Sequence, residues 1–170
     1  MFRLLPEAKL PPPLRPPIPP LPKPCWTSKK EAAKFIREWL PTLPHDCLCV
    51  YSDGSGASTD RVSWAFVTFV SGTGTVIEQS GSGQIMNAEV YDAEVHGAMA
   101  ALEAITTRNR DCGRSAIYIL LDNSAAVQAL LTGITVSSSW RIQKFCKMVA
   151  NASAPVKVGW IPGHAGLAGN

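Results

Sequence analysis

The chain has 170 residues, of which 46% are hydrophobic and 17% charged, enough to bury the core of one domain with an appended segment. Residues 1–44 hold eight Lys and Arg against three Asp and Glu, whereas residues 45–170 hold eight against ten. The net charge of +3 is therefore concentrated at the N-terminus. The net charge gives no reason to expect that residues 45–170 bind nucleic acid, so evidence for such binding must come from a specific site.

The sequence shows no sign of a membrane segment. It contains no run of about 18 apolar residues and no apolar core of a signal peptide. We expect an intracellular protein without membrane contact, and the pattern does not separate nucleus from cytoplasm. The five cysteines lack the spacing of a metal motif, and Cys47 and Cys49 are predicted to be small buried residues on one face of a strand.

The first 27 residues are rich in proline. Ten of the 14 prolines lie between Pro6 and Pro24, and such a run favours an extended, polyproline-like spacer. We interpret residues 1–27 as a linker from a longer polyprotein. The alternative is a ligand for an SH3-like groove or an interaction adaptor, a match that proline-rich linkers also produce by chance.

An amphipathic helix is predicted in the next segment, residues 28–44. Ser28 and Glu31 have the spacing of a capping box, and apolar residues follow at helical intervals until Pro41. We expect this lead-in helix to pack on the flank of the domain that follows.

Residues 45–170 show strand patterns first and then alternate between strand and helix. Strands are predicted over 47–53, 62–70, 75–85, 115–121 and 155–161. Helices are predicted over 87–108, 123–131 and 138–150. Short Gly-rich connections make the first three strands an antiparallel meander. The order indicates the α/β class, with a mixed sheet flanked by helices.

Three acidic residues lie beside apolar sequence near the ends of these elements. Asp53 closes the first predicted strand, Glu94 lies early in the long helix, and Asp122 ends the buried strand. Such positions can converge at one edge of a sheet, where grouped carboxylates need cations such as Mg²⁺. Each residue alone has a simpler explanation. Asp53 could belong to a turn, Glu94 could be solvated on its helix, and Asp122 could cap the following helix.

A histidine follows the last strand in the motif WIPGHAGLAGN. His164 lies in a Gly-flanked loop, where an exposed imidazole with a pKa near neutrality could transfer protons. A lone histidine is more often structural, so this interpretation depends on the acidic residues.

Together the motifs YSDGSG, AEVHGAMAALEA, LLDNSAAV and WIPGHAGLAGN resemble the successive motifs of type 1 ribonuclease H. The resemblance covers about residues 47–170. Within the family, the sequence most resembles the ribonuclease H domains of fungal non-LTR retrotransposon polyproteins. It implies a ribonuclease H-like fold with a mixed five-stranded sheet. It also implies an endonuclease that hydrolyses the RNA strand of RNA–DNA hybrids, and an upstream reverse transcriptase domain as a possible partner; the oligomeric state is left open.

The resemblance also assigns roles to individual residues. Asp53 would bridge two Mg²⁺ ions, with Mn²⁺ as an alternative, and Glu94 and Asp122 would complete the ligands of the second ion. His164 would assist proton transfer or product departure. The substrate would be contacted through ribose 2′-hydroxyls by residues that follow two of the acids, namely Gly54, Ser55, Gly56 and Asn123.

The sequence departs from the family pattern in three places. Tyr91-Asp92-Ala93 replaces the residues that contact substrate in the bacterial branch, so those contacts are not transferred. No tryptophan-rich basic protrusion is evident. The predicted helix at 138–150 carries the basic residues Arg141, Lys144 and Lys147. They could form a cationic edge that contacts nucleic acid, or they could simply be a solvated helix face.

The third departure is at the C-terminus. The sequence ends at Asn170, and the resemblance implies that the family's fourth catalytic aspartate would lie four residues further on and that the last helix of the fold would be missing. We expect a C-terminally truncated domain with weaker Mg²⁺-dependent cleavage. The alternative is a remnant that binds nucleic acid without cleaving it.

Overall fold

A computed structural model describes residues 28–58, 60–71, 77–134 and 138–163. The strands are β1 (Leu48–Ser58), β2 (Arg61–Val70), β3 (Ile77–Met86), β4 (Ile117–Leu121) and β5 (Val156–Trp160). The helices are α1 (Lys29–Trp39), α2 (Val90–Thr107), α3 (Ser124–Thr132) and α4 (Ser139–Asn151), with a 3₁₀ turn at Leu40–Thr42. Every predicted element is present. The proline-rich residues 1–27 and His164 lie outside the described residues.

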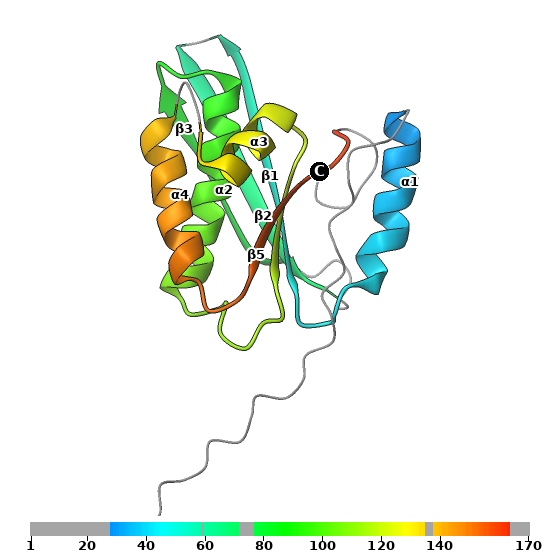
Figure 1. Ribbon diagram of the computed structural model, residues 1–170. Helices are drawn as coiled ribbons and strands as arrows, with labels where there is room; N and C mark the ends of the chain where they lie inside the picture. The colour runs from blue at the N-terminus through cyan, green and yellow to red at the C-terminus, as the bar shows by residue number, and fades with distance from the viewer. Residues whose placement is uncertain (1–27, 59, 72–76, 135–137, 164–170) are drawn as a thin grey trace, which may run out of the picture.

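The five strands form one mixed sheet in the order β3-β2-β1-β4-β5. The first three strands pair antiparallel, while β4 and β5 run parallel to β1. Helices α2, α3 and α4 cover one face of the sheet and α1 lies on the other (Figure 1). The predicted α/β class, meander and mixed sheet are confirmed.

Strand β4 is buried along its whole length because both faces of the sheet are covered there. Its alternate residues Ile117, Ile119 and Leu121 enter the core formed with α2, α3 and α4. Tyr118 and Leu120 point the other way, into a second core that is completed by α1. A strand buried on both faces reads as a continuous apolar run, and this explains the pattern of its sequence.

Helix α1 begins and ends as its sequence predicts. The Ser28 hydroxyl accepts a hydrogen bond from the Glu31 amide at 3.2 Å, and the 3₁₀ turn that contains Pro41 ends the helix. Ile36 and Trp39 are buried, and the Trp39 ring meets Tyr118 edge-on at 5.2 Å. The helix therefore packs on the face of the sheet rather than on its flank.

The same second core holds both strand cysteines. Cys47 and Cys49, two residues apart in the sequence, are both buried on the face that α1 covers, which confirms their predicted placement. Burial raises the pKa of the Cys49 thiol to about 12, so this thiol stays protonated and unreactive.

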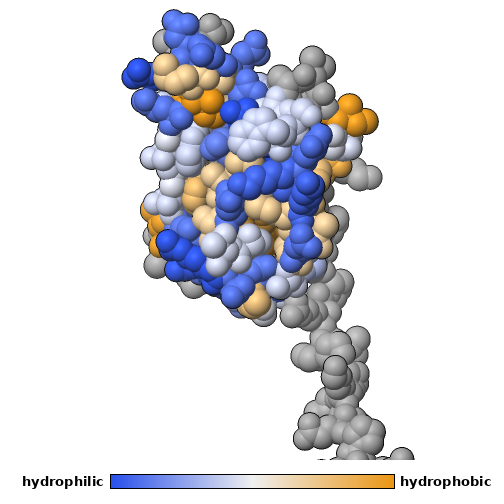
Figure 2. Space-filling model, turned by 90° about the vertical axis from the view of Figure 1, so that its left-hand side faces the viewer, coloured by the Kyte–Doolittle hydropathy of each residue, from blue (hydrophilic) through white to orange (hydrophobic). Residues whose placement is uncertain are grey.

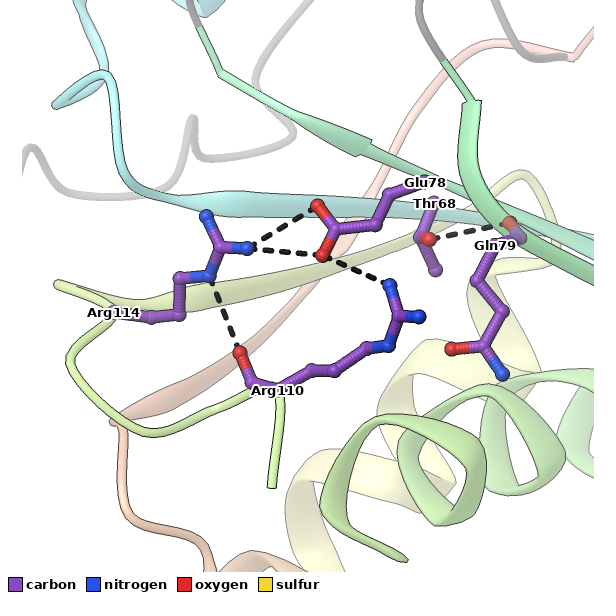
Figure 3. A network of polar contacts seen from close by, with 5 residues as sticks. All are labelled: Thr68, Glu78, Gln79, Arg110 and Arg114. Atoms are coloured by element: carbon purple, nitrogen blue, oxygen red, sulfur yellow. Dashed lines mark hydrogen bonds and ion pairs between the residues drawn. The ribbon is translucent and has the colours of Figure 1, made fainter. Parts of the chain in front are cut away.

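Strand β3 is an edge strand, and ion pairs fasten it to the segment that follows α2 (Figure 3). Glu78 accepts from Arg110 at 3.1 Å and from Arg114 at 3.0 Å. Within the sheet, the Thr68 hydroxyl donates to the Gln79 carbonyl at 3.1 Å. The three charges are only partly exposed, so this network holds β3 in place more firmly than isolated surface pairs would.

Helix α4 packs on α2 through Ile142 and Phe145. Figure 2 shows the side of the molecule on which α4 lies, and hydrophobic residues are visible there between hydrophilic ones. Lys144 pairs with Glu103 of α2 at 2.7 Å, and Arg141 lies 3.9 Å from Asp92. Two of the three basic residues of α4, Arg141 and Lys144, thus interact with acidic residues of α2. The sequence had suggested a cationic edge or a solvated helix face, and neither includes these contacts. Lys147 is exposed.

Among the described residues, no helix is both long and apolar enough to cross a membrane.

The contact of α1 with the sheet yields a stability prediction. We expect Ile36→Ala to lower the free energy of unfolding by about 2–5 kcal/mol, because Ile36 is fully buried and its loss leaves a cavity. Chemical denaturation measures the change. The control is Lys34→Ala, which removes only an exposed pair with Glu38 and should change stability by less than about 1 kcal/mol. Equal effects of the two substitutions would show that α1 does not pack on the domain.

Candidate metal centre

Asp53 lies inside a strand rather than at its end. Strand β1 continues to Ser58 because β2 remains paired with it through Ser55 and Ser63. The parallel pairing with β4 stops earlier, at Ser52 and Leu121. The predicted end of the strand at Asp53 was therefore wrong, and so was the Asp-Gly turn. Asp53 instead lies where β1 extends beyond the carboxyl end of β4.

Asp122 follows β4 directly, at the same edge of the sheet. It does not cap α3. The side-chain oxygen of Asn123 accepts hydrogen bonds from the amides of Ala125 and Ala126 at 3.0 and 3.1 Å, so Asn123 is the cap. This use of Asn123 was not foreseen, since the resemblance implied a contact with substrate.

The position of Asp122 is set by the end of β5, the other neighbour of β4, and by the segment that follows β5. The Trp160 indole donates to the Asp122 carbonyl at 2.8 Å. Gly163 passes so close to the Asp122 carboxylate that a Cβ at Gly163 would collide with it. His164 comes next in the chain, outside the described residues, so its predicted role stays a prediction.

Glu94 comes to the site from the first turns of α2, and a glycine allows this. A Cβ at Gly54 would lie 2.8 Å from the Val90 carbonyl oxygen and 2.9 Å from the Glu94 amide nitrogen. Only glycine lets β1 approach the helix so closely. The Gly54 amide donates to the Glu94 carboxylate, and the predicted contact of Gly54 with substrate stays a prediction. Ser55 and Gly56 are exposed.

The three acids meet at this place. Asp53, Glu94 and Asp122 each offer a carboxylate oxygen, and these oxygens lie within 4.8 Å of one another. Glu94 is 2% exposed, which rules out the solvated position considered from its sequence. Among the described residues, its Oε2 atom is buried without a hydrogen-bond partner.

Burial and charge repulsion act on Glu94 together. Burial is the largest cause that raises the pKa of Glu94, to about 8, and the neighbouring carboxylates Asp122 and Asp53 raise it further, against the hydrogen bond from Gly54. A buried carboxylate with like charges beside it requires a proton or a cation. Three clustered carboxylates, one of which has an unsatisfied oxygen, are the donor set that a hard divalent cation prefers. The residues therefore fit a metal centre.

A buried polar group that the sequence analysis did not single out lies on the first turn of α2. The Asp92 carboxylate accepts from the Glu89 amide at 3.0 Å and from the Ser138 hydroxyl. It thereby ties the start of α4 to the helix that carries Glu94. The spacing of Glu89 and Asp92, an acidic residue at the third position of a helix, was the signal that could have revealed it.

Comparison with known proteins adds information at the level of the fold. No protein-family model and no curated protein matches this sequence. Solved structures do match. RNase H1 from the archaeon Halobacterium salinarum is 20% identical with a TM-score of 0.57, over 69% of this chain and 86% of that one. The N-terminal RNase H domain of a Mycobacterium tuberculosis protein, fused to maltose-binding protein, is 14% identical with a TM-score of 0.58, over 69% and 83%.

A third structure is LC11-RNase H1, a protein isolated from compost by a metagenomic approach, in complex with an RNA/DNA hybrid. In that complex it is 15% identical to this chain with a TM-score of 0.56, over 68% of this chain and 86% of that one. The predicted ribonuclease H-like fold is confirmed by these three likenesses.

The raised pKa of Glu94 predicts how stability depends on pH. Without metal, the folded state keeps a proton on Glu94 that the unfolded chain releases near the usual value of 4.5. The free energy of unfolding should therefore fall as pH rises from 4.5 to about 8. At pH 8, Mg²⁺ at 100 times its dissociation constant should restore about 2.7 kcal/mol.

Glu94→Gln should remove most of this pH dependence and of the stabilisation by Mg²⁺, because the amide carries no charge. Denaturation curves in EDTA and in Mg²⁺ across this pH range provide the measurement. The control is Glu38→Gln on the exposed face of α1, which should leave both effects intact. An unchanged pH slope in Glu94→Gln would contradict the assignment of the slope to this group.

Proposed function

We propose that this chain is a metal-dependent endonuclease that hydrolyses the RNA strand of RNA–DNA hybrids. The observation that carries the proposal is the gathering of Asp53, Glu94 and Asp122 within 4.8 Å at one edge of a ribonuclease H-like sheet. The fold alone would not justify it, because one fold supports many functions. The hybrid bound by the LC11 enzyme adds support, since that protein shares the fold.

In this proposal Asp53, Glu94 and Asp122 would hold two divalent ions, Mg²⁺ with Mn²⁺ as the alternative. When bound, such ions would supply a lower pKa for an attacking water and stabilisation of the leaving 3′-oxygen, as expected for products with 5′-phosphate and 3′-hydroxyl ends. His164 is proposed to assist proton transfer or product departure from the loop after Gly163.

The protein's own contribution is to hold three negative charges in fixed positions. Burial removes water from Glu94, and the Gly54 amide orients its carboxylate. The Trp160 indole and Gly163 confine Asp122 on its other side. A cluster of this charge repels the phosphodiester of a nucleic acid unless cations compensate it. Substrate binding at the acids is therefore coupled to metal binding.

We further propose that the domain derives from a non-LTR retrotransposon polyprotein with a reverse transcriptase domain upstream. The support is the resemblance of its four motifs to that branch of the family and the proline-rich residues 1–27, whose composition suits a linker between domains.

The test compares Asp53→Asn with the unsubstituted chain on a labelled hybrid in Mg²⁺. We expect cleavage to fall at least about 100-fold, because a charge that holds the cations is lost, while the dissociation constant for the hybrid changes less than about tenfold. Gel analysis of the products and a binding titration give the two numbers. Asp60→Asn is the control, since Asp60 is exposed and outside the cluster, and it should cleave normally.

Two results would overturn the proposal. Cleavage that survives in Asp53→Asn would refute the metal-site assignment. Binding of the hybrid by the unsubstituted chain without any cleavage would identify a hybrid-binding module instead of an enzyme. Duplex DNA and duplex RNA, tested in parallel, should remain uncut.

A further inference from the structure

Glu94 of the candidate metal centre lies between two polar residues that face the opposite way. At about 3.6 residues per turn, Asp92 and His96 lie about 160° around α2 from Glu94 and next to each other. Glu94 points to the edge of the sheet, while Asp92 and His96 contact the start of α4, which packs beside α2 (Figure 1). Contacts on this far side of the helix therefore hold the same turns that carry Glu94.

Both carboxylate oxygens of Asp92 are bound, each by a different part of the chain. One oxygen accepts from the Glu89 amide at 3.0 Å and so fixes the first turn of α2. The other accepts from the Ser138 hydroxyl at the start of α4. Arg141 donates to the Ser138 hydroxyl at 3.2 Å, and its Nε donates to His96 Nδ1, also at 3.2 Å. The start of α4 is thus joined to α2 at two positions one turn apart.

Ser138 has an unusual backbone conformation. Its φ is 55°, in the left-handed region, where a residue other than glycine persists only if surrounding contacts require it. Ser138 is also the N-cap of α4, and a serine at this position usually accepts from the amides of its own helix. Among the described residues Ser138 makes no such capping bond, and its hydroxyl donates to Asp92 instead. The contact with Asp92 is thus made in place of a cap on α4.

A second polar contact between α2 and α4 offers a comparison. Lys144 pairs with Glu103 at 2.7 Å, but these side chains are 41% and 46% exposed, whereas those of Arg141 and Asp92 are 13% and 12% exposed. A buried network with satisfied hydrogen bonds fixes one geometry, while an exposed pair contributes little. Glu103 also lies about 13 Å further along α2 than Glu94, at about 1.5 Å per residue. Of the two contacts, the one at Asp92 therefore bears on the position of Glu94.

We propose that Asp92 is a positioning residue for the metal centre. Held by Ser138 and by the amide at the start of α2, it keeps the first turns of this helix in place, so that the Glu94 carboxylate stays where a divalent cation binds. The inference rests on the proposed metal-dependent function, because it concerns the affinity of the same three carboxylates for the cation. Asp92 is not one of these three and acts through the helix.

The physical reason is the repulsion at the metal centre. Glu94 is buried beside Asp53 and Asp122, so without a cation the three carboxylates repel one another. Glu94 is the member that an entire helix carries, and the ends of helices fray most readily. A buried contact on the far side of α2 opposes both the repulsion and the fraying.

The experiment weakens this contact without changing the metal ligands. The main variant is Ser138→Gly, which removes the hydroxyl that binds Asp92 and leaves every charge in place. Glycine adopts a φ of 55° without strain, so this variant should fold. The second variant is Asp92→Asn, whose carboxamide has one acceptor oxygen in place of two. Its matched control is Glu103→Gln, which also removes one negative charge from α2 and one contact with α4.

Titration calorimetry of the full chain without nucleic acid measures the affinity for Mg²⁺. We expect the dissociation constant to rise about threefold to tenfold in Ser138→Gly, the contribution of one hydrogen bond. In Asp92→Asn it should rise about tenfold or more, as for other groups that orient metal ligands. Glu103→Gln should stay within about twofold of the parent, because an exposed ion pair contributes little. Thermal melting in EDTA should show that all three variants are folded.

Cleavage of a labelled hybrid provides a second measurement. Ser138→Gly should need about threefold to tenfold more Mg²⁺ for half-maximal cleavage, and excess Mg²⁺ should restore most of the loss. The KM for the hybrid in excess Mg²⁺ should not change, since Ser138 is buried. A contact that only stabilises the fold would leave the requirement for Mg²⁺ as it is in the parent.

Mg²⁺ binding by Ser138→Gly and Asp92→Asn with the affinity of the parent would overturn the positioning role while the proposed function stands. An equal loss in Glu103→Gln would also overturn it, because the packing of α4 on α2 in general would then be responsible. A raised KM with unchanged affinity for Mg²⁺ would make the start of α4 a substrate contact instead. If the unsubstituted chain neither binds Mg²⁺ nor cleaves hybrids, the proposed function fails, and the positioning role falls with it.

Discussion

Helix α2 lies so close to β1 that a side chain at Gly54 would meet the helix backbone. The same closeness recurs one turn further along α2, where a Cβ at Gly97 would collide with the Ser52 hydroxyl and lie 3.1 Å from the Ala65 carbonyl. These two glycines let the helix approach β1 and β2 more closely than any residue with a Cβ would allow. The contact brings Glu94 to the sheet edge where Asp53 and Asp122 already lie.

Placing Glu94 there is unfavourable for the protein without metal. Its carboxylate is buried, beside two other acids, and its pKa is raised to about 8. Hydrophobic packing of α2 on the sheet supplies the free energy that holds it in place, through residues such as Val95, Ala98 and Leu102, which are fully buried. The site thus lowers the stability of the metal-free protein, and a bound cation would offset this loss.

The extent to which helices cover the sheet changes from β4 to the edge strand β3. Strand β4 is buried by helices on both sides, and Asp122 follows its end. Toward β3 the sheet face that α1 covers elsewhere forms a groove of about 300 Å³ that leads away from Asp53 and is lined by small polar residues such as Ser63 and Ser82. The ion pairs of Glu78 with Arg110 and Arg114 hold this less buried part of the sheet against the segment after α2.

The sequence by itself determined the elements, their order and the acidic residues, because strand and helix periodicities and capping residues are local properties. It did not determine where β1 ends or which residue caps α3: Asp53 remains in the strand because a distant neighbour, β2, stays paired with it, and Asn123 takes the cap that Asp122 could have made. The burial of Glu94, the contact of Asp92 with Ser138 and the groove beside Asp53 were decided only by the tertiary structure, since each depends on side chains far apart in the chain that meet only when the chain folds.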